Sequence, residues 1–324
     1  MTAARSIDHG MFVAINGVDQ WVTLRGADVG NPALLIIGGP GAAFSRLAPF
    51  FAPWQRDFTL VQWDQPGAGA TWALNGDVGT GPLSLDRIAA DGVAVAEFAL
   101  EHLGARRLAL LGVSGGSIVG LMMARRRPDL FCACVETGQI IDWARQDTIS
   151  YAMLLQRAQV AGDQAAVDEL QAIGPPPYPD MAADAVKSRH AGALTPAEQA
   201  EWAGLAPELM AAINEPPPGA AYAPRDLAFA DPRALATETY DRLRGEIVGF
   251  DARRLGLAFE VPMVFLQGDQ DVFTVTSEVR AYAAEITAPS VVFDLIPGGG
   301  HSAVFLRAPF LDLLRRYVLP LAAS

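Results

Sequence analysis

The chain has 324 residues, of which 51% are hydrophobic and 19% charged, so its composition is that of a globular protein and excludes a disordered acidic polymer. It carries 24 basic and 36 acidic residues, a formal net charge of −12 at pH 7, which argues against nucleic acid as a partner because phosphate backbones repel an acidic surface. The length corresponds to two domains of ~150 residues or one large α/β unit.

The first third of the chain alternates between strand and helix patterns. Two alternating segments at 11–15 and 20–24 flank Asn16-Gly17, which predicts a β-hairpin. Compact apolar runs at 33–37, 58–63 and 107–111 each end in a glycine-rich turn, and helical periodicity covers 84–103 and 118–127. This alternation predicts an α/β fold with a mostly parallel central sheet and helices on both faces.

The pattern changes after about residue 137. Residues 139–249 are rich in alanine and helical in period, and proline triplets at 175–177 and 216–218 divide them. Within this stretch Thr195-Pro196 with Glu198 three residues after the threonine is typical of a helix start. We therefore expect a helical cap at 138–249, inserted into a core formed by 1–137 and 250–324.

The sheet pattern returns after the insert. Apolar runs at 261–266 and 290–296 predict two more strands, each followed by a turn that contains polar residues, and 309–318 predicts a last amphipathic helix.

Cysteine usage and hydropathy bear on the compartment. The two cysteines, Cys132 and Cys134, are two positions apart in an apolar run, so in a regular strand they share one face and serve as buried packing in a reducing compartment. The sequence has no metal-ligand spacing, no apolar signal region at its start and no run of about 18 apolar residues. We expect a cytoplasmic protein with no metal, no other cofactor and no membrane partner.

Ser114 is the candidate nucleophile. Gly112-Val113-Ser114-Gly115-Gly116 matches G-x-S-x-G between a predicted strand and a predicted helix, the context in which a tight turn lifts a serine hydroxyl above the sheet. The amide of Gly115 then lies at a helix N-terminus, directed at any negative charge that forms nearby.

A serine hydroxyl needs a base, and the chain offers four histidines. His9 precedes the first hairpin, His102 lies in a predicted helix and His190 lies in the insert. His301 follows three glycines at a strand end, on a loop that can reach the carboxyl edge of the sheet. His301 is therefore the candidate base.

The base in turn needs a carboxylate that fixes its tautomer. Asp269 and Asp271 both follow the strand at 261–266, and Glu136 follows the elbow helix as a more distant rival. The order Ser114, Asp271, His301 is nucleophile, acid, base.

An oxyanion hole needs a second amide besides that of Gly115. Gly38-Gly39-Pro40-Gly41 ends the strand at 33–37, where glycine lets the backbone approach closely and proline fixes the turn. We assign the second amide to Gly39.

These motifs together resemble the proline iminopeptidase branch (peptidase family S33) of the α/β-hydrolases. The resemblance rests on Gly38-Gly39-Pro40-Gly41, on Asp64-Gln65-Pro66-Gly67-Ala68-Gly69, on the Ser114 elbow, and on Gly268-Asp269-Gln270-Asp271 with Gly300-His301. It extends more loosely into the insert, through residues 162–178. It implies an α/β-hydrolase core with a helical cap over the active site, and the family's G-x-x-D spacing selects Asp271 over Asp269.

Three positions depart from that branch. Ile37 stands where the family usually has histidine, Gly115 where proline iminopeptidases usually have tryptophan, and Pro66 where the usual residue is arginine. The resemblance also implies cap glutamates that hold the free amino group of a peptide, for which this chain offers Glu201, Glu208 and Glu215 without an alignment that selects one.

The sequence therefore predicts a serine hydrolase that transfers an acyl group to water, most like a proline iminopeptidase-type aminopeptidase acting on a short peptide. An esterase, lactonase or amidase acting on a small apolar molecule is the alternative within the same chemistry. A non-catalytic protein that uses the hydrolase pocket to bind a ligand is the alternative from another class. The oligomeric state is not predicted.

Overall fold

The computed structural model describes residues 5–214 and 232–322. Its first two strands, β1 (Ile7–Ile15) and β2 (Val18–Gly26), form the predicted hairpin. Asn16 and Gly17 make the turn with φ values of 48° and 86°, a left-handed backbone that asparagine and glycine adopt at the least cost.

The hairpin forms one edge of an eight-stranded sheet with the order β1-β2-β4-β3-β5-β6-β7-β8. β2 is antiparallel to β4. From β4 onward in this order, β3 included, all strands run parallel to one another. These strands are β3 (Ala33–Ile37), β4 (Thr59–Asp64), β5 (Leu108–Val113), β6 (Phe131–Thr137), β7 (Met263–Gly268) and β8 (Val291–Ile296). The predicted mostly parallel sheet is confirmed, and the carboxyl ends of its parallel strands meet at one edge.

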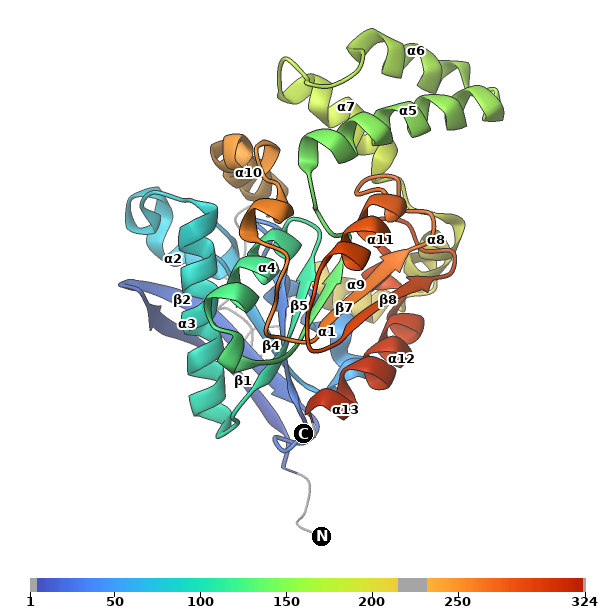
Figure 1. Cartoon of the computed structure of the whole chain (residues 1–324). Coiled ribbons are helices and arrows are strands. Elements are labelled where there is room, and N and C mark those ends of the chain that lie inside the picture. Colours follow the sequence, from blue (N-terminus) through green and yellow to red (C-terminus); the bar gives the residue numbers. More distant parts are fainter. Residues whose placement is uncertain (1–4, 215–231, 323–324) are drawn as a thin grey trace.

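Helices cover both faces of this sheet, as predicted (Figure 1). One face packs on α3 (Leu85–Leu103), α4 (Gly116–Arg126), α10 (Pro232–Val248) and α11 (Thr276–Glu285). The other packs on α1 (Ala48–Phe51), α9 (Pro207–Asn214) and α12 (Arg307–Tyr317). The remaining helices of the core, α2 (Gly69–Thr80) and α13 (Leu319–Ala322), lie against β2 and α12 respectively.

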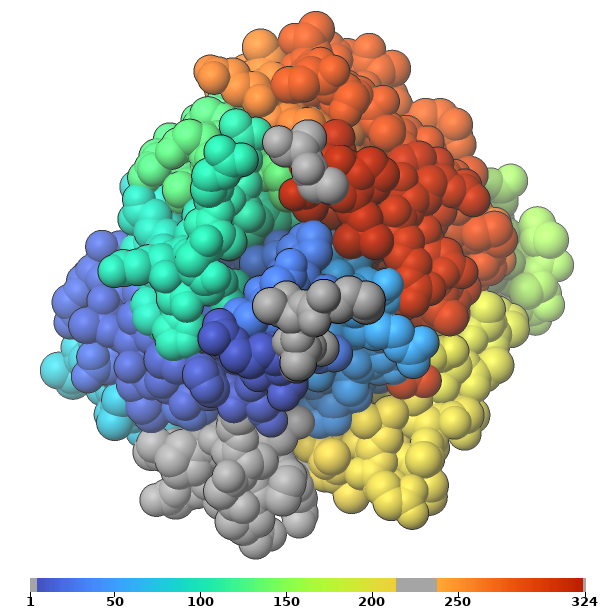
Figure 2. Space-filling view, turned by 90° about the horizontal axis from the view of Figure 1, so that it is seen from below, coloured from blue at the N-terminus to red at the C-terminus, as the bar shows by residue number. Residues whose placement is uncertain are grey.

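The segment around α1 and the C-terminal helix come together on the face of the sheet that also packs on α9. Trp54 stacks on Phe310 with ring centroids 5.5 Å apart. Figure 2 shows this side from below, with the residues near position 50 in lighter blue beside the C-terminal residues in red. The contact joins segments that are far apart in the sequence into one apolar layer.

The two cysteines do not share a face of β6, and the expectation that they do is wrong. Leu108 pairs with Phe131 and Ala109 with Ala133, so the register skips Cys132. Such a β-bulge inserts one residue and breaks the alternation of side chains. Cys132 consequently packs under one face of the sheet and Cys134 under the other, and both are buried free thiols.

Helices fill the described part of the chain between β6 and β7. They are α5 (Trp143–Ala161), α6 (Gln164–Ile173), α7 (Met181–Ala191), α8 (Pro196–Ala203), α9 and α10. Helices α5, α6 and α7 have a small apolar cluster of their own and project from the rest of the molecule (Figure 1). Helices α9 and α10 instead contribute side chains to the two main apolar clusters, one on each face of the sheet.

Among the helices of residues 5–214 and 232–322, none has both the length and the apolar character needed to cross a bilayer.

Candidate active site

Ser114 occupies a strained turn between β5 and α4. Its φ of 54° lies in the left-handed region, which is costly for a residue with a side chain and persists only where the surroundings enforce it. The Ser114 amide donates to Thr137 O at 2.9 Å, and the Ser117 amide and hydroxyl both donate to Ser114 O, at 2.8 and 2.5 Å. These bonds fix the predicted elbow from both sides.

The structure brings Ser114 and His301 together across 187 positions of sequence. Ser114 Oγ lies 2.8 Å from His301 Nε2, and His301 Nδ1 lies 3.1 Å from Asp271 Oδ2. Because an ionised carboxylate only accepts hydrogen bonds, Nδ1 carries the proton and Nε2 is left as an acceptor for the serine hydroxyl. This arrangement gives the serine a base with the correct tautomer.

Asp271 is buried and its carboxylate is fully occupied by donors. It accepts hydrogen bonds from the backbone amides of Phe273 (2.7 Å) and Thr274 (3.0 Å) and from the side chains of Thr274 (2.7 Å) and Gln267 (2.7 Å). Burial raises the pKa of Asp271, but the charge and hydrogen bond of His301 and the bonds from Thr274 outweigh it, so the pKa lies below its usual range. Asp271 therefore stays ionised beside the imidazole.

The two rival carboxylates lie elsewhere. Asp269 is exposed, and its Oδ1 accepts a hydrogen bond from the Gly298 amide at 2.9 Å. Glu136 is completely buried and accepts a hydrogen bond from Cys134 Sγ at 3.1 Å. Burial raises the pKa of Glu136 well above its usual range. Of the three candidates, Asp271 is the one hydrogen-bonded to His301.

Gly39 and Gly115 bring two backbone segments into contact next to Ser114. A methyl group built on Gly115 would lie 3.0 Å from Pro40 Cδ and 3.1 Å from Gly39 Cα. One built on Gly39 would lie 3.6 Å from the Gly115 nitrogen. The absence of a side chain at Gly115 permits this approach, and it brings the turn after β3 to the start of α4.

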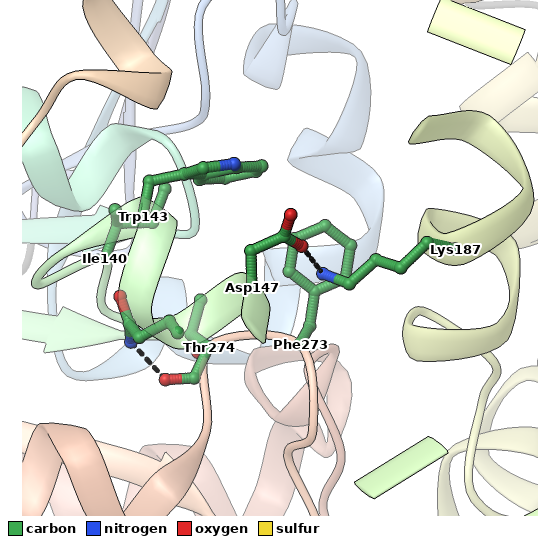
Figure 3. Close-up of a pocket in the computed structure, with 7 residues that line it drawn as sticks. Ile140, Trp143, Asp147, Lys187, Phe273 and Thr274 are labelled. Carbon is green, nitrogen blue, oxygen red and sulfur yellow. Dashed lines mark hydrogen bonds and ion pairs between the residues drawn. The ribbon is translucent and has the colours of Figure 1, made fainter. Parts of the chain in front are cut away.

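A layer of side chains from the loop after β7 and from the insert lies against the ring of His301. Phe273 stacks on the imidazole with centroids 4.4 Å apart, and Lys187 Nζ lies over the Phe273 ring, 4.4 Å from its centroid. Lys187 and Asp147 are both buried and form an ion pair of 2.6 Å (Figure 3). The side-chain amide of Gln146 donates to Thr274 O, so α5 also holds the loop that carries Asp271.

Our reading of the sequence missed this layer, although one signal for it was present. Lys187 is the only lysine in a chain that otherwise uses arginine. A lysine ammonium is a compact charge that fits between an aromatic ring and a carboxylate, where a guanidinium needs more room.

Of the glutamates considered for amine binding, the two that the structure describes have other surroundings. Glu201 pairs with Arg307 at 2.6 Å, Glu208 is exposed, and Glu215 lies outside the described residues. Two other carboxylates, Asp147 and Asp184, instead line a cavity of about 190 Å³ in the insert.

That cavity is walled by Trp143 and Tyr178, and Arg244 also lines it. Burial and the charge of Asp147 raise the pKa of Asp184. Tyr178 Oη and Arg244 Nε are buried there without a hydrogen-bond partner in the described part of the chain. The cavity thus holds polar groups that a bound molecule could satisfy.

A second cavity, of about 320 Å³, reaches His301 and Gly300 from the side of α5, α6 and α7. Its wall is polar and apolar in equal parts, with Arg157 and Asp163 as well as Leu154 and Val272 among the lining residues. Within residues 5–214 and 232–322, no three His, Cys, Asp or Glu side chains are grouped so that they could hold a metal ion.

Comparison with known proteins places this site in a family context. The model of the alpha/beta hydrolase fold family matches residues 32–308. A probable aminopeptidase of Bacillus subtilis, YbaC, is 24% identical over 280 residues, which cover 86% of this chain and 85% of that protein. A probable proline iminopeptidase of Streptomyces coelicolor is 33% identical over 134 residues, 40% of this chain and 40% of that protein.

Solved structures share the fold. A proline iminopeptidase-related protein from Thermus thermophilus has a TM-score of 0.62 at 17% identity, covering 98% of this chain and 99% of its own. A thermophilic esterase from Thermogutta terrifontis has a TM-score of 0.57 at 17% identity, covering 98% of this chain and 100% of its own. The predicted fold class and the resemblance to the family are confirmed.

Proposed function

Because the chain belongs to the alpha/beta hydrolase family, we propose that it is a serine hydrolase with Ser114 as nucleophile, His301 as base and Asp271 as the acid that orients it. The observation that carries this proposal is the continuous contact from Ser114 Oγ to His301 Nε2, at 2.8 Å, and from His301 Nδ1 to Asp271, at 3.1 Å. No cofactor enters the reaction.

The chemistry follows from these contacts. As Ser114 Oγ bonds to the substrate carbonyl carbon, its proton passes to His301 Nε2, and the carbonyl oxygen becomes an oxyanion. His301 then returns the proton to the leaving group, whose bond to the carbonyl carbon breaks. A water molecule then bonds to the acyl carbon as its proton passes to His301 Nε2, the bond between that carbon and Ser114 Oγ breaks, and His301 returns the proton to Oγ. Asp271 remains ionised throughout and stabilises the imidazolium.

The amides of Gly39 and Gly115 are our candidates for the oxyanion hole. The close approach of the two glycines supports this assignment, because both amides belong to backbone segments that meet beside Ser114. Each donor of this kind lowers the barrier by about 2.7–4 kcal/mol.

For the substrate we propose a peptide with a free N-terminus, cleaved by an aminopeptidase activity of the proline iminopeptidase type. The probable aminopeptidase of Bacillus subtilis supports this choice, since it aligns over most of both chains. The cavity lined by Asp147 and Asp184 supports it as well: Asp147 is paired with Lys187, and a cationic amine would compensate the carboxylate of Asp184. Trp143 of that cavity contacts Phe273, which stacks on His301.

In this proposal residues 138–249 are the cap, and residues 1–137 and 250–324 are the core. The cap then supplies the amine site and limits the access of water to Ser114.

Two measurements test the proposal. Purified protein is incubated with a fluorophosphonate probe, with Ser114→Ala as the matched variant, and hydrolysis of a prolyl anilide is compared with that of short-chain nitrophenyl esters. We expect labelling that Ser114→Ala abolishes, and faster hydrolysis of the anilide. Faster hydrolysis of the esters would contradict the aminopeptidase activity and favour an esterase activity instead. Equal labelling of both proteins would show that Ser114 is not an activated nucleophile. The result would favour a ligand-binding protein on a hydrolase fold.

A further inference from the structure

The loop that carries His301 rests on the first turn of helix α8. Thr195, the N-cap of that helix, donates from Oγ1 to Gly298 O at 2.6 Å. A methyl group built on Gly300 would lie 3.0 Å from Thr195 Cγ2. The backbone of the His301 loop therefore packs directly on the start of α8, although the two segments are more than a hundred positions apart in the sequence.

Among the α8 residues that bind this loop, Glu198 binds the position next to His301. Its Oε2 accepts a hydrogen bond from the Thr195 amide at 2.8 Å, which completes the predicted capping box. Its Oε1 accepts one from the Gly300 amide, also at 2.8 Å, and Gly300 directly precedes His301. The side chain is completely buried, so no water competes for either oxygen.

This second bond exceeds what a capping box requires. In a capping box the glutamate side chain binds only the N-cap amide, whereas here its other oxygen binds a backbone amide of the core. Without it, the Gly300 amide would be left buried without an acceptor, which is costly. The carboxylate thus fixes the peptide unit from which the imidazole projects.

We propose that Glu198 is a positioning residue for His301, acting from α8 through the Gly300 amide; this inference rests on the proposed function. The opposite side of the same loop has its own anchors. The Gly298 amide donates to Asp269 and the Gln270 amide donates to Gly299 O. Removal of Glu198 should therefore leave the loop folded, with the base less well aligned on Ser114.

The test compares three variants with the wild-type chain. Glu198→Ala removes both acceptors, and Glu198→Gln keeps one, because its amide nitrogen cannot accept. Glu246→Gln is the matched control, since Glu246 also joins an insert helix to a core backbone amide, that of Leu85, at 3.0 Å. Each protein is titrated with the fluorophosphonate probe to separate the maximal labelling rate from the probe's affinity, and its thermal midpoint is recorded.

We expect Glu198→Ala to lower the maximal labelling rate by about 10- to 100-fold, since a displacement of about 1 Å has effects of this size. The probe's affinity should be unchanged, Glu198→Gln should fall between Glu198→Ala and wild type, and Glu246→Gln should label at the wild-type rate. Wild-type rates in both Glu198 variants would overturn the positioning role while leaving the hydrolase intact. A wild-type chain that does not label at all would overturn the hydrolase, and this inference with it.

Discussion

Phe273 lies nearly parallel to the imidazole of His301, with the ring centroids 4.4 Å apart and the planes inclined by 21°. Phe273 also donates its backbone amide to Asp271 Oδ1 at 2.7 Å. One residue thus touches the proposed base through its ring and the proposed orienting acid through its backbone. The ring limits the rotation of the imidazole, while the amide belongs to the turn that holds the carboxylate.

Replacement of Phe273 by leucine should lower the rate of serine labelling. The backbone bond to Asp271 survives, so the loss reports on the ring alone. Aromatic pairs contribute about 0.5–1.5 kcal/mol beyond the area they bury, which corresponds to a loss of about 2- to 10-fold. The rate of fluorophosphonate labelling measures it, and a rate equal to that of wild type would show that the ring does not hold the imidazole.

The two aspartates after β7 should differ sharply in their effect on activity. Asp271→Asn replaces the acceptor of the His301 Nδ1 proton by a group that can favour the wrong tautomer, and we expect a loss of about 10⁴-fold in kcat. Asp269→Asn keeps an oxygen for the Gly298 amide, and we expect less than about a tenfold loss. Steady-state hydrolysis of the preferred substrate compares them, and a larger loss in Asp269→Asn would reverse the assignment.

Local patterns in the sequence were enough to predict the elements that build this site. β3 and α3, with its Ser84 cap, occur where apolar runs, caps and glycine turns placed them. The carboxyl edge of a parallel sheet collects its loops, so Ser114 and His301 could be paired from chain order alone. The choice of Asp271 over Asp269 needed the family spacing, because both follow the same strand.

What could not be predicted depends on contacts between distant segments. The bulge at Cys132 arises from the pairing of β6 with β5. The alternation of apolar and polar residues along a strand does not indicate such a bulge. Glu198 was read as half of a capping box, but its bond to Gly300 requires the position of α8 against the loop. The burial of Lys187 could not be predicted from its helix, whose composition is ordinary, because burial depends on how the helices of the insert pack.

Lys187 and Asp147 should be strongly interdependent for stability. Both are buried, and Lys187→Met would leave the Asp147 carboxylate without its partner. Breaking a buried pair in this way costs about 3–5 kcal/mol, whereas removing both charges can be nearly neutral. We expect a large fall in the free energy of unfolding for Lys187→Met and a substantial recovery when Asp147→Leu is added. Denaturant titrations measure both, and additive effects of the two changes would argue against a coupled pair.

Glu136 should make the protein less stable as the pH rises. Burial raises its pKa well above the usual range, so the folded chain keeps the proton where the unfolded chain releases it. The folded state therefore binds more protons above the unfolded pKa of about 4.3, and the free energy of unfolding falls with pH by up to about 1.4 kcal/mol per unit. Below that pH both states are protonated and the effect disappears.

Glu136→Gln removes this titration with little change in shape. The difference in free energy of unfolding between Glu136→Gln and wild type should be constant below about pH 4 and should grow in favour of the variant as the pH rises above the unfolded pKa. Urea titrations at several pH values measure it, with Glu208→Gln as an exposed control that should show no such trend. A pH-independent difference would mean that Glu136 ionises as readily in the folded chain as in the unfolded one. Water would then have to reach its Oε2, which has no partner within the described residues.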